Sequence, residues 1–324
     1  MVKLAFRRVI WGFAMAIAVS AIVFVIFYVL PSGDPAVMRA GPGATPEQVE
    51  VVRHSLALDR PPHAQYAQFL WNLTVHHDLG YSYHHLMPVS SLIWSRLPVT
   101  LALVVGGVAI ALVAGIGLGV RSAGRPGSNL DRAVSFGSLV LISAPVFWLG
   151  FVAAMLFSRG TISFLPDLPG PGAWIGAETL AQSLGALILP WLVLGFSSAA
   201  IYFRFTREIV IDELNQPYVT AARARGISEN RIRRYALRTG MAPLLALAGL
   251  DLGLVLAGNV ILVETVFNLP GVGRLLVESV ERADLPLTQG IVLVGLVAVV
   301  VVTIAVDVTH AAIDPRARSQ EGPI

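Results

Sequence analysis

The sequence has no cysteine and a single lysine, Lys3, among its 324 residues. The missing cysteine excludes a disulfide framework, a thiolate metal site and a cysteine nucleophile, and it leaves the redox compartment open. Charged residues make up only 13% of the chain, whereas soluble domains have about a quarter. Hydrophobic residues account for 55%, and the mean hydropathy is +0.72. This composition predicts a membrane protein without the exposed basic domain that nucleic-acid binding requires.

Motifs for nucleotide binding and catalysis are also missing from the sequence. A Walker A loop needs a lysine that reaches the β- and γ-phosphates, and Lys3 lies outside any such motif. The sequence contains no G-x-S-x-G elbow and no H-E-x-x-H helix. We therefore expect no catalytic residue and no cofactor in this chain.

Six apolar runs are long enough to cross about 30 Å of hydrocarbon. They are Val9–Leu30, Val99–Val120, Val134–Phe157, Leu184–Phe203, Met241–Val263 and Leu287–Thr309. No small-x-small cleavage site follows the first run, so we interpret it as a retained helix rather than a signal peptide. The pattern predicts an all-α integral membrane protein with six transmembrane helices.

The basic residues predict the orientation. With the N-terminus inside, most of the 23 basic residues fall in cytoplasmic segments, which is a positive-inside pattern. We expect a multi-pass protein of the cell membrane, plasma or inner, with both termini in the cytoplasm. The expected divisions are a cytoplasmic tip and first helix (1–30), an extracytoplasmic subdomain (31–98), a five-helix core (99–312) with a cytoplasmic loop at 212–240, and a cytoplasmic tail (313–324).

The predicted outer segment has its own helical pattern around Pro46–Leu58, with Thr45 as N-cap, and around Gln65–Leu73. It also contains six of the seven histidines: His54, His63, His76, His77, His84 and His85. Adjacent histidines point in different directions on a helix, and no carboxylate pattern supports them. We therefore favour a polar surface loop over a metal site.

Small residues and prolines mark the apolar runs. Gly107, Ala111, Gly115 and Gly119 repeat every four residues, a spacing that lets helices approach closely in lipid. Pro145 and Pro190 are expected to interrupt the third and fourth helices.

Two polar residues lie within the fifth apolar run. Asp251 and Asn259 are separated by eight residues, about 80° around a regular helix, and could therefore line one cavity. A charged group in lipid is costly, so Asp251 should face protein or water. Two roles remain open: a group on a translocation path, or a buried hydrogen bond between helices.

The stretch Tyr218–Leu245 lies between two apolar runs. Tyr218, Ala221, Ala222 and Arg225 share one helical face. Gly226 can adopt the left-handed conformation that ends this helix, and Ser228 is a suitable N-cap for a second one, on which Arg231, Arg234 and Arg238 share a side. The pattern fits either a basic loop that only fixes orientation or a compact docking surface.

This stretch resembles the EAA loop of ABC-importer permeases of the peptide/nickel family. The matching residues are Tyr218, Ala222, Arg223, Ala224, Gly226, Ala236, Leu237, Arg238, Pro243 and Leu244. The sequence departs from the pattern at Thr220, where the motif has Glu, and at Arg225, where Lys is usual. The resemblance extends to the segment from Glu264 that contains Pro270 and Gly271, and to Ile313–Arg316.

The resemblance implies a type I ABC-importer permease fold with an extracytoplasmic subdomain after the first helix. It implies the permease subunit of an ATP-driven importer of di- or oligopeptides, with nickel or a nickel complex as the alternative cargo. The implied partners are a second homologous permease subunit, two ATPases that bind ATP and Mg, and an extracytoplasmic substrate-binding protein. The residues implied to contact an ATPase are Tyr218, Thr220, Ala221, Ala222, Arg223, Arg225, Gly226, Arg231 and Arg234. A proton-coupled secondary transporter or channel that uses Asp251 is the alternative.

Overall fold

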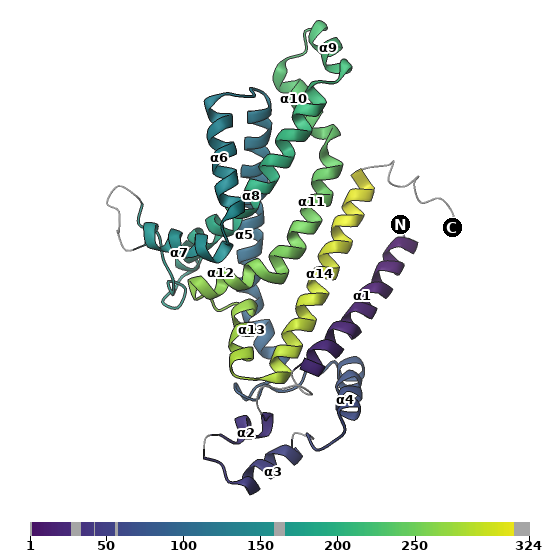
Figure 1. The fold of residues 1–324 in the computed structure, drawn as a ribbon, viewed down its shortest axis with the longest axis vertical. Coiled ribbons are helices and arrows are strands. Elements are labelled where there is room, and N and C mark those ends of the chain that lie inside the picture. Colours follow the sequence, from purple (N-terminus) through teal and green to yellow (C-terminus); the bar gives the residue numbers. More distant parts are fainter. Residues whose placement is uncertain (1, 27–33, 42, 56–57, 159–165, 314–324) are drawn as a thin grey trace. The chain divides into compact units, whose positions relative to one another are not determined.

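A computed structural model describes residues 2–26, 34–41, 43–55, 58–158 and 166–313. The named elements in these ranges are all helices, which confirms the all-α part of the predicted fold class (Figure 1). In chain order they are α1 (Val2–Phe24), α2 (Pro35–Ala40), α3 (Pro46–Ser55), α4 (Pro62–Val75), α5 (Val89–Ala123), α6 (Asn129–Ser143), α7 (Val146–Phe157), α8 (Leu180–Leu214), α9 (Pro217–Ala224), α10 (Glu229–Thr239), α11 (Met241–Leu254), the π-helix η2 (Val255–Asn259), α12 (Val260–Phe267), α13 (Val272–Glu281) and α14 (Leu285–Ile313).

The chain divides into two compact units. Of the described residues, unit 1 contains those of Leu101–Leu269 and 301–313, and unit 2 contains those of Val2–Thr100 and Pro270–Val300. Helices α5 and α14 each contribute one part to each unit.

Four helices of the described chain are long and apolar enough to cross a membrane: α5, α8, the run Met241–Phe267 and α14. The pair α6 and α7 makes a fifth if its two halves form one span. The apolar part of α1, Ala14–Phe24, is shorter. The predicted first span extends into residues 27–30, which lie outside the described residues. The structure thus supports four or five spans, and the predicted count of six is not confirmed.

The third predicted span is broken at Pro145. Helices α6 and α7 meet there at an angle of 114°, and Ala144 has an extended backbone. A proline disfavours helical geometry in the residue before it, which explains the break. By contrast, α8 continues through Pro190, so the predicted interruption of the fourth helix is wrong. Neighbouring helices can satisfy the backbone groups that a proline leaves without a helical hydrogen bond, so a membrane helix can continue through it.

Helices α5 and α8 are in backbone contact within unit 1. A Cβ atom on Gly115 would lie 2.8 Å from the carbonyl oxygen of Ala199, and one on Gly119 would lie 2.9 Å from that of Phe203. These separations are too short for any side chain. The glycine repeat predicted from the sequence therefore lies where α5 and α8 are closest.

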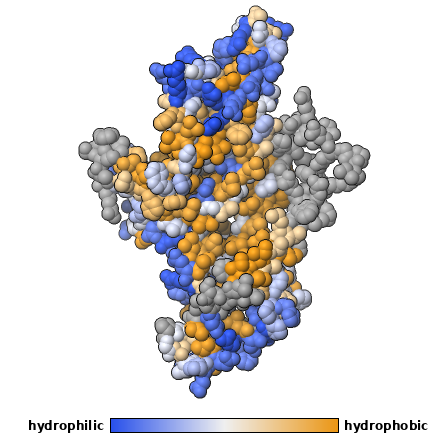
Figure 2. Space-filling view, in the orientation of Figure 1, coloured by the Kyte–Doolittle hydropathy of each residue, from blue (hydrophilic) through white to orange (hydrophobic). Residues whose placement is uncertain are grey.

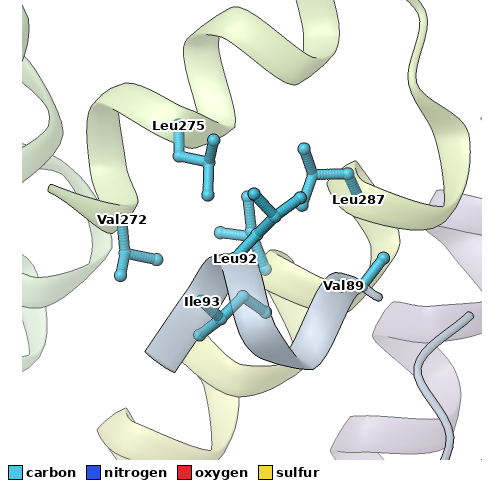
Figure 3. Packing of buried hydrophobic residues seen from close by; sticks show 7 residues of the cluster. Val89, Leu92, Ile93, Val272, Leu275 and Leu287 are labelled. Atoms are coloured by element: carbon cyan, nitrogen blue, oxygen red, sulfur yellow. The ribbon is translucent and has the colours of Figure 1, made fainter. Parts of the chain in front are cut away.

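Unit 2 has a core where the start of α5 packs against α13 and the start of α14. Figure 3 shows Val89, Leu92 and Ile93 on one side of this core, facing α13 and Leu287. The backbone N–H of Val272 also donates to the Thr100 hydroxyl at 2.8 Å, which fixes the beginning of α13.

A buried carboxylate holds the segment before α5 in place. Asp284, at the turn between α13 and α14, is 1% exposed. It accepts hydrogen bonds from the Ser82 hydroxyl and from the backbone N–H groups of Tyr83 (3.1 Å) and His84 (3.0 Å). Satisfying a buried carboxylate in this way ties together two segments 200 residues apart.

The helices expected before residue 98 are present as α3 and α4. The predicted N-cap is confirmed, because the Thr45 hydroxyl accepts from the Gln48 N–H at 3.3 Å and the Gln48 side chain accepts from the Thr45 N–H at 2.9 Å. Residues 56–57 of the predicted first helix lie outside the described residues. Tyr66 of α4 contacts α1, since its hydroxyl lies 2.8 Å from that of Ser20.

The contact between α5 and α8 predicts how two glycines of one helix respond to the same substitution. Gly115→Ala should destabilise the protein by about 1–3 kcal/mol, because the new methyl group overlaps the backbone of α8. Gly117→Ala is the matched control, because its Cβ would meet nothing within 4 Å. Thermal unfolding in one detergent measures both variants, and equal melting temperatures would contradict the proposed packing.

Candidate functional site

The stretch that resembles the EAA loop folds as two short helices, α9 and α10, joined at Gly226; we call Pro217–Thr239 the Gly226 hairpin. Gly226 has φ +75°, and the Ile227 N–H donates to the Ala222 carbonyl at 3.1 Å. The predicted left-handed end of the first helix is therefore confirmed. Ser228 occupies the N-cap position of α10, as predicted, but its hydroxyl makes no capping hydrogen bond.

The hairpin exposes most of the residues that the sequence selected. Exposed side chains are those of Tyr218, Thr220, Ala221, Arg223, Arg225, Arg231 and Arg234, and Ala222 is half-buried. The apolar residues of α10 differ in exposure, since Ile232 and Ala236 are buried whereas Tyr235 is 47% exposed. The structure therefore places the selected residues on one exposed element, available for contact with another protein.

An ion pair closes the turn at Gly226. Arg223 Nε donates to Glu229 Oε1 at 2.7 Å, and this hydrogen bond lowers the pKa of the Glu229 carboxyl. On the preceding side, the Tyr218 hydroxyl donates to Glu213 at 2.9 Å. Burial raises the pKa of Tyr218, and the contact with Glu213 adds to the increase, so the phenol keeps its proton at neutral pH. Within the described chain, Arg225, Arg231 and Arg234 make no ion pair and remain available cations.

The hairpin is packed onto the ends of the long helices of unit 1. Ala236 forms a buried cluster with Ala123 at the end of α5 and Val210 near the end of α8. The side chain of Arg233 lies against Gly124, where an added Cβ would be 2.6 Å from its guanidinium. Helix α10 ends at Thr239 and α11 begins at Met241, and Gly240 between them packs tightly against Ile209.

Asp251 is buried between helices. Its side chain accepts from the Ser198 hydroxyl of α8 at 3.2 Å, and Tyr202, one turn further along α8, interacts electrostatically with the same carboxylate. Asp251 is 7% exposed, whereas Asn259 is half-buried. The contact with Ser198 is the interhelical hydrogen bond that the sequence left open as one of two roles.

A π-helix, η2, begins four residues after Asp251 and ends at Asn259. The five residues of η2 depart from regular α-helical spacing, and such turns occur frequently at functional sites. The predicted angle of about 80° between Asp251 and Asn259 assumed a regular α-helix and therefore does not hold. The sequence offers no distinct signal for a π-turn at this position.

The histidines that invited a metal interpretation do not gather. His54 lies 3.3 Å from Asp59, and the rings of His84 and His85 meet edge to face at 5.1 Å. Burial lowers the pKa of His85, and repulsion from His84 lowers it further. In the described ranges, no group of three or more His, Cys, Asp or Glu side chains is placed to hold a metal ion.

An ion pair between the buried Asp131 of α6 and the half-buried Arg207 of α8 was not predicted. Arg207 donates to both oxygens of Asp131, with Nε–Oδ1 and Nη2–Oδ2 distances of 2.6 and 2.9 Å. The Gly127 N–H also donates to Asp131 at 2.8 Å. This contact fixes the loop after α5. In the sequence, only the acidic residue at the start of α6 indicated a contact of this kind.

Comparison with known proteins gives consistent results for both parts of the chain. Residues 115–319 match the family described as binding-protein-dependent transport system inner membrane component. Residues 1–104 match the N-terminal family of membrane components of the same transport systems.

Individual relatives are similar over nearly their whole length. A protein of Brucella abortus named as a peptide transport system permease is 36% identical over 324 residues, covering 98% of this chain and 99% of the relative. The glutathione transport system permease protein GsiC of Escherichia coli K12 is 35% identical over 319 residues, with the same coverage of both chains.

Proposed function

The chain belongs to the family of inner membrane components of binding-protein-dependent transport systems, and from this premise we propose that it is the permease subunit of an ATP-driven importer of peptides. The observation that carries the proposal is similarity over the whole chain to permeases named for peptide and glutathione transport. Glutathione is itself a small peptide, so both names support di- or oligopeptides as the cargo class. They do not favour nickel, and membership of a binding-protein-dependent family does not favour a secondary transporter or channel.

The energy for transport comes from other subunits in this proposal. The only lysine is Lys3, so the chain has no phosphate-binding Walker A lysine. The partners are a second homologous permease subunit, two ATPases that bind ATP and Mg, and an extracytoplasmic binding protein that delivers the peptide. The two permease subunits together form the path through the membrane.

The orientation follows from the distribution of basic residues. With both termini in the cytoplasm, the Gly226 hairpin faces the cytoplasm together with Arg121 and Arg125. Residues 31–98 then form an extracytoplasmic subdomain, 99–312 the permease core and 313–324 a cytoplasmic tail. Residues 314–324, which include most of the Ile313–Arg316 motif, lie outside the described residues.

The Gly226 hairpin is the proposed coupling element. Its exposed residues insert into a cleft of an ATPase, and Arg225, Arg231 and Arg234 contact acidic groups there. ATP-driven closure of the two ATPases moves the hairpins. The packing of Ala236 against α5 and α8 passes this displacement to the membrane helices.

Asp251 and Asn259 are proposed to lie beside the translocation path. The π-turn that ends at Asn259 supports this role, because π-turns are frequent at functional sites and ionisable groups within membrane segments often mark substrate paths. The hydrogen bond from Ser198 offers a purely structural role for the same carboxylate.

The transport assignment is tested by purifying the chain from its native membrane with the subunits that remain bound to it. The complex should hydrolyse ATP, and in liposomes it should accumulate a labelled dipeptide only when ATP and the binding protein are present. The chain alone should move no peptide. Uptake by the isolated chain would overturn the assignment.

Gly226 provides a test of coupling in that complex. Its Cβ position is open and its φ is positive, so a substitution acts only through the backbone. Gly226→Val should reduce ATP-driven uptake by about tenfold or more, because a β-branched residue strains a left-handed position. Gly226→Asn should retain uptake, because Asn tolerates that conformation. Equal uptake by the two variants, with unchanged assembly, would refute the coupling role.

Asp251→Asn tests the path. It should slow uptake without lowering the melting temperature, because an amide can still accept the Ser198 hydrogen bond but has no charge. Ser198→Ala is the control: it removes the same hydrogen bond, leaves the carboxylate, and should retain uptake. If both variants lose uptake and stability together, Asp251 has only the structural role of accepting the hydrogen bond from Ser198.

A further inference from the structure

A small cavity lies between α6 and α8. Its volume is about 130 Å³, and it is lined by Leu139 and Phe203 on the apolar side and by Arg204, Arg207 and Glu208 on the polar side. A water molecule occupies about 30 Å³ of liquid, so the cavity can admit a polar group several times larger than one water.

The cavity lies where the two helices change from apolar to charged. The apolar run of α8 ends at Phe203, and Arg204, Arg207 and Glu208 follow it. In α6 the charged Asp131 and Arg132 come before the apolar part of the helix. Figure 2 shows the same change within unit 1, with hydrophilic residues over α9 and α10 and apolar residues over the neighbouring helical body. In a membrane protein this boundary lies at the level of the lipid headgroups.

Large apolar side chains on α6 and α8, at or next in sequence to residues that line the cavity, are exposed in this chain. Phe136 is 70% exposed, Leu139 50% and Phe205 45%. Large exposed side chains next to a polar cavity at this depth suit a phospholipid, whose acyl chains would cover them while its headgroup enters the cavity.

The charges of the cavity add to zero. Arg207 uses two of its N–H groups on Asp131, which cancels its charge. Arg204 and Glu208 make no hydrogen bond and no salt bridge within the described residues, although Glu208 acts electrostatically on Arg207. The cavity therefore offers one available guanidinium and one available carboxylate. A simple anion would meet attraction and repulsion together.

We propose that this cavity binds the headgroup of a zwitterionic phospholipid that carries a primary ammonium, of the phosphatidylethanolamine type. Arg204 and the unused edge of Arg207 bind the phosphate, and Glu208 accepts hydrogen bonds from the ammonium. Phosphatidylglycerol has no cation for Glu208. The quaternary ammonium of phosphatidylcholine has no N–H to donate. This site goes beyond the transport function and rests only on insertion of the chain into a membrane.

The proposal is tested by lipid competition. The full chain, purified with its bound subunits and stripped of lipid, is offered equal amounts of phosphatidylethanolamine, phosphatidylcholine and phosphatidylglycerol with identical acyl chains. Native mass spectrometry measures retention. Phosphatidylethanolamine should be retained about tenfold over the other two, and stepwise N-methylation of its headgroup should remove the preference without any mutation.

Two single variants assign the headgroup contacts. Glu208→Gln should reduce the preference for phosphatidylethanolamine over phosphatidylcholine severalfold, because the neutral amide still accepts a hydrogen bond but loses the charge that strengthens hydrogen bonds from the primary ammonium. Arg204→Gln should weaken the retention of phosphatidylethanolamine and of phosphatidylcholine by about tenfold, because both headgroups contain the phosphate. The matched control is Arg121→Gln with Asp212→Asn, which removes one cation and one carboxylate from α5 and α8 outside the cavity and should change nothing.

Several results would overturn the site. These are equal retention of the three lipids by the unmodified chain, a preference for phosphatidylglycerol, no retained lipid, or an unchanged preference in Glu208→Gln. Cross-linking from Leu139 to another subunit would show that a protein surface, and not a lipid, covers this face.

Discussion

The close contact between α5 and α8 is the constraint on which unit 1 depends. At Gly115 and Gly119 the two backbones lie so near that no side chain fits between them. Lipid provides no hydrophobic force to drive helices together, so the association of α5 with α8 relies on packing and on hydrogen bonds such as that from Trp191 Nε1 to the Ala102 carbonyl. The other helices of the unit are then positioned against α8: α6 through Asp131 and Arg207, and α10 through its buried alanine.

Much of this arrangement could be predicted from the sequence, because it rests on local rules. The spacing of Gly107, Gly115 and Gly119 indicated a close helix contact, and Gly226 indicated a left-handed turn between two short helices. Both depend on what glycine alone can do within a few residues. The break at Pro145 follows from the same kind of rule, but the outcome at Pro190 depends on neighbouring helices that the sequence does not reveal.

The contacts that sequence analysis missed join residues far apart in the chain. Asp284 binds the backbone of Tyr83 and His84, and Arg207 binds Asp131. A lone acid at a helix end has many permitted partners, so its charge indicates only that a partner exists. The π-turn at Val255–Asn259 was missed for a different reason. It changes the helical phase, and no proline or other residue in the sequence indicates it.

The proposed importer takes its energy from separate ATPase subunits. It therefore needs helices that transmit movement and points at which the chain can bend. Helix α8 belongs to the first kind, since glycine contacts on one side and the Asp131–Arg207 pair on another leave it little room to slide. The π-turn at the end of α11 belongs to the second, because regular helical hydrogen bonding changes there. In the proposed coupling, α8 and its packed neighbours pass on a displacement of the Gly226 hairpin, while the π-turn is the place where the chain after α11 can bend. Asp251 lies one helical turn before that π-turn, next to the part of the chain that can change its contacts.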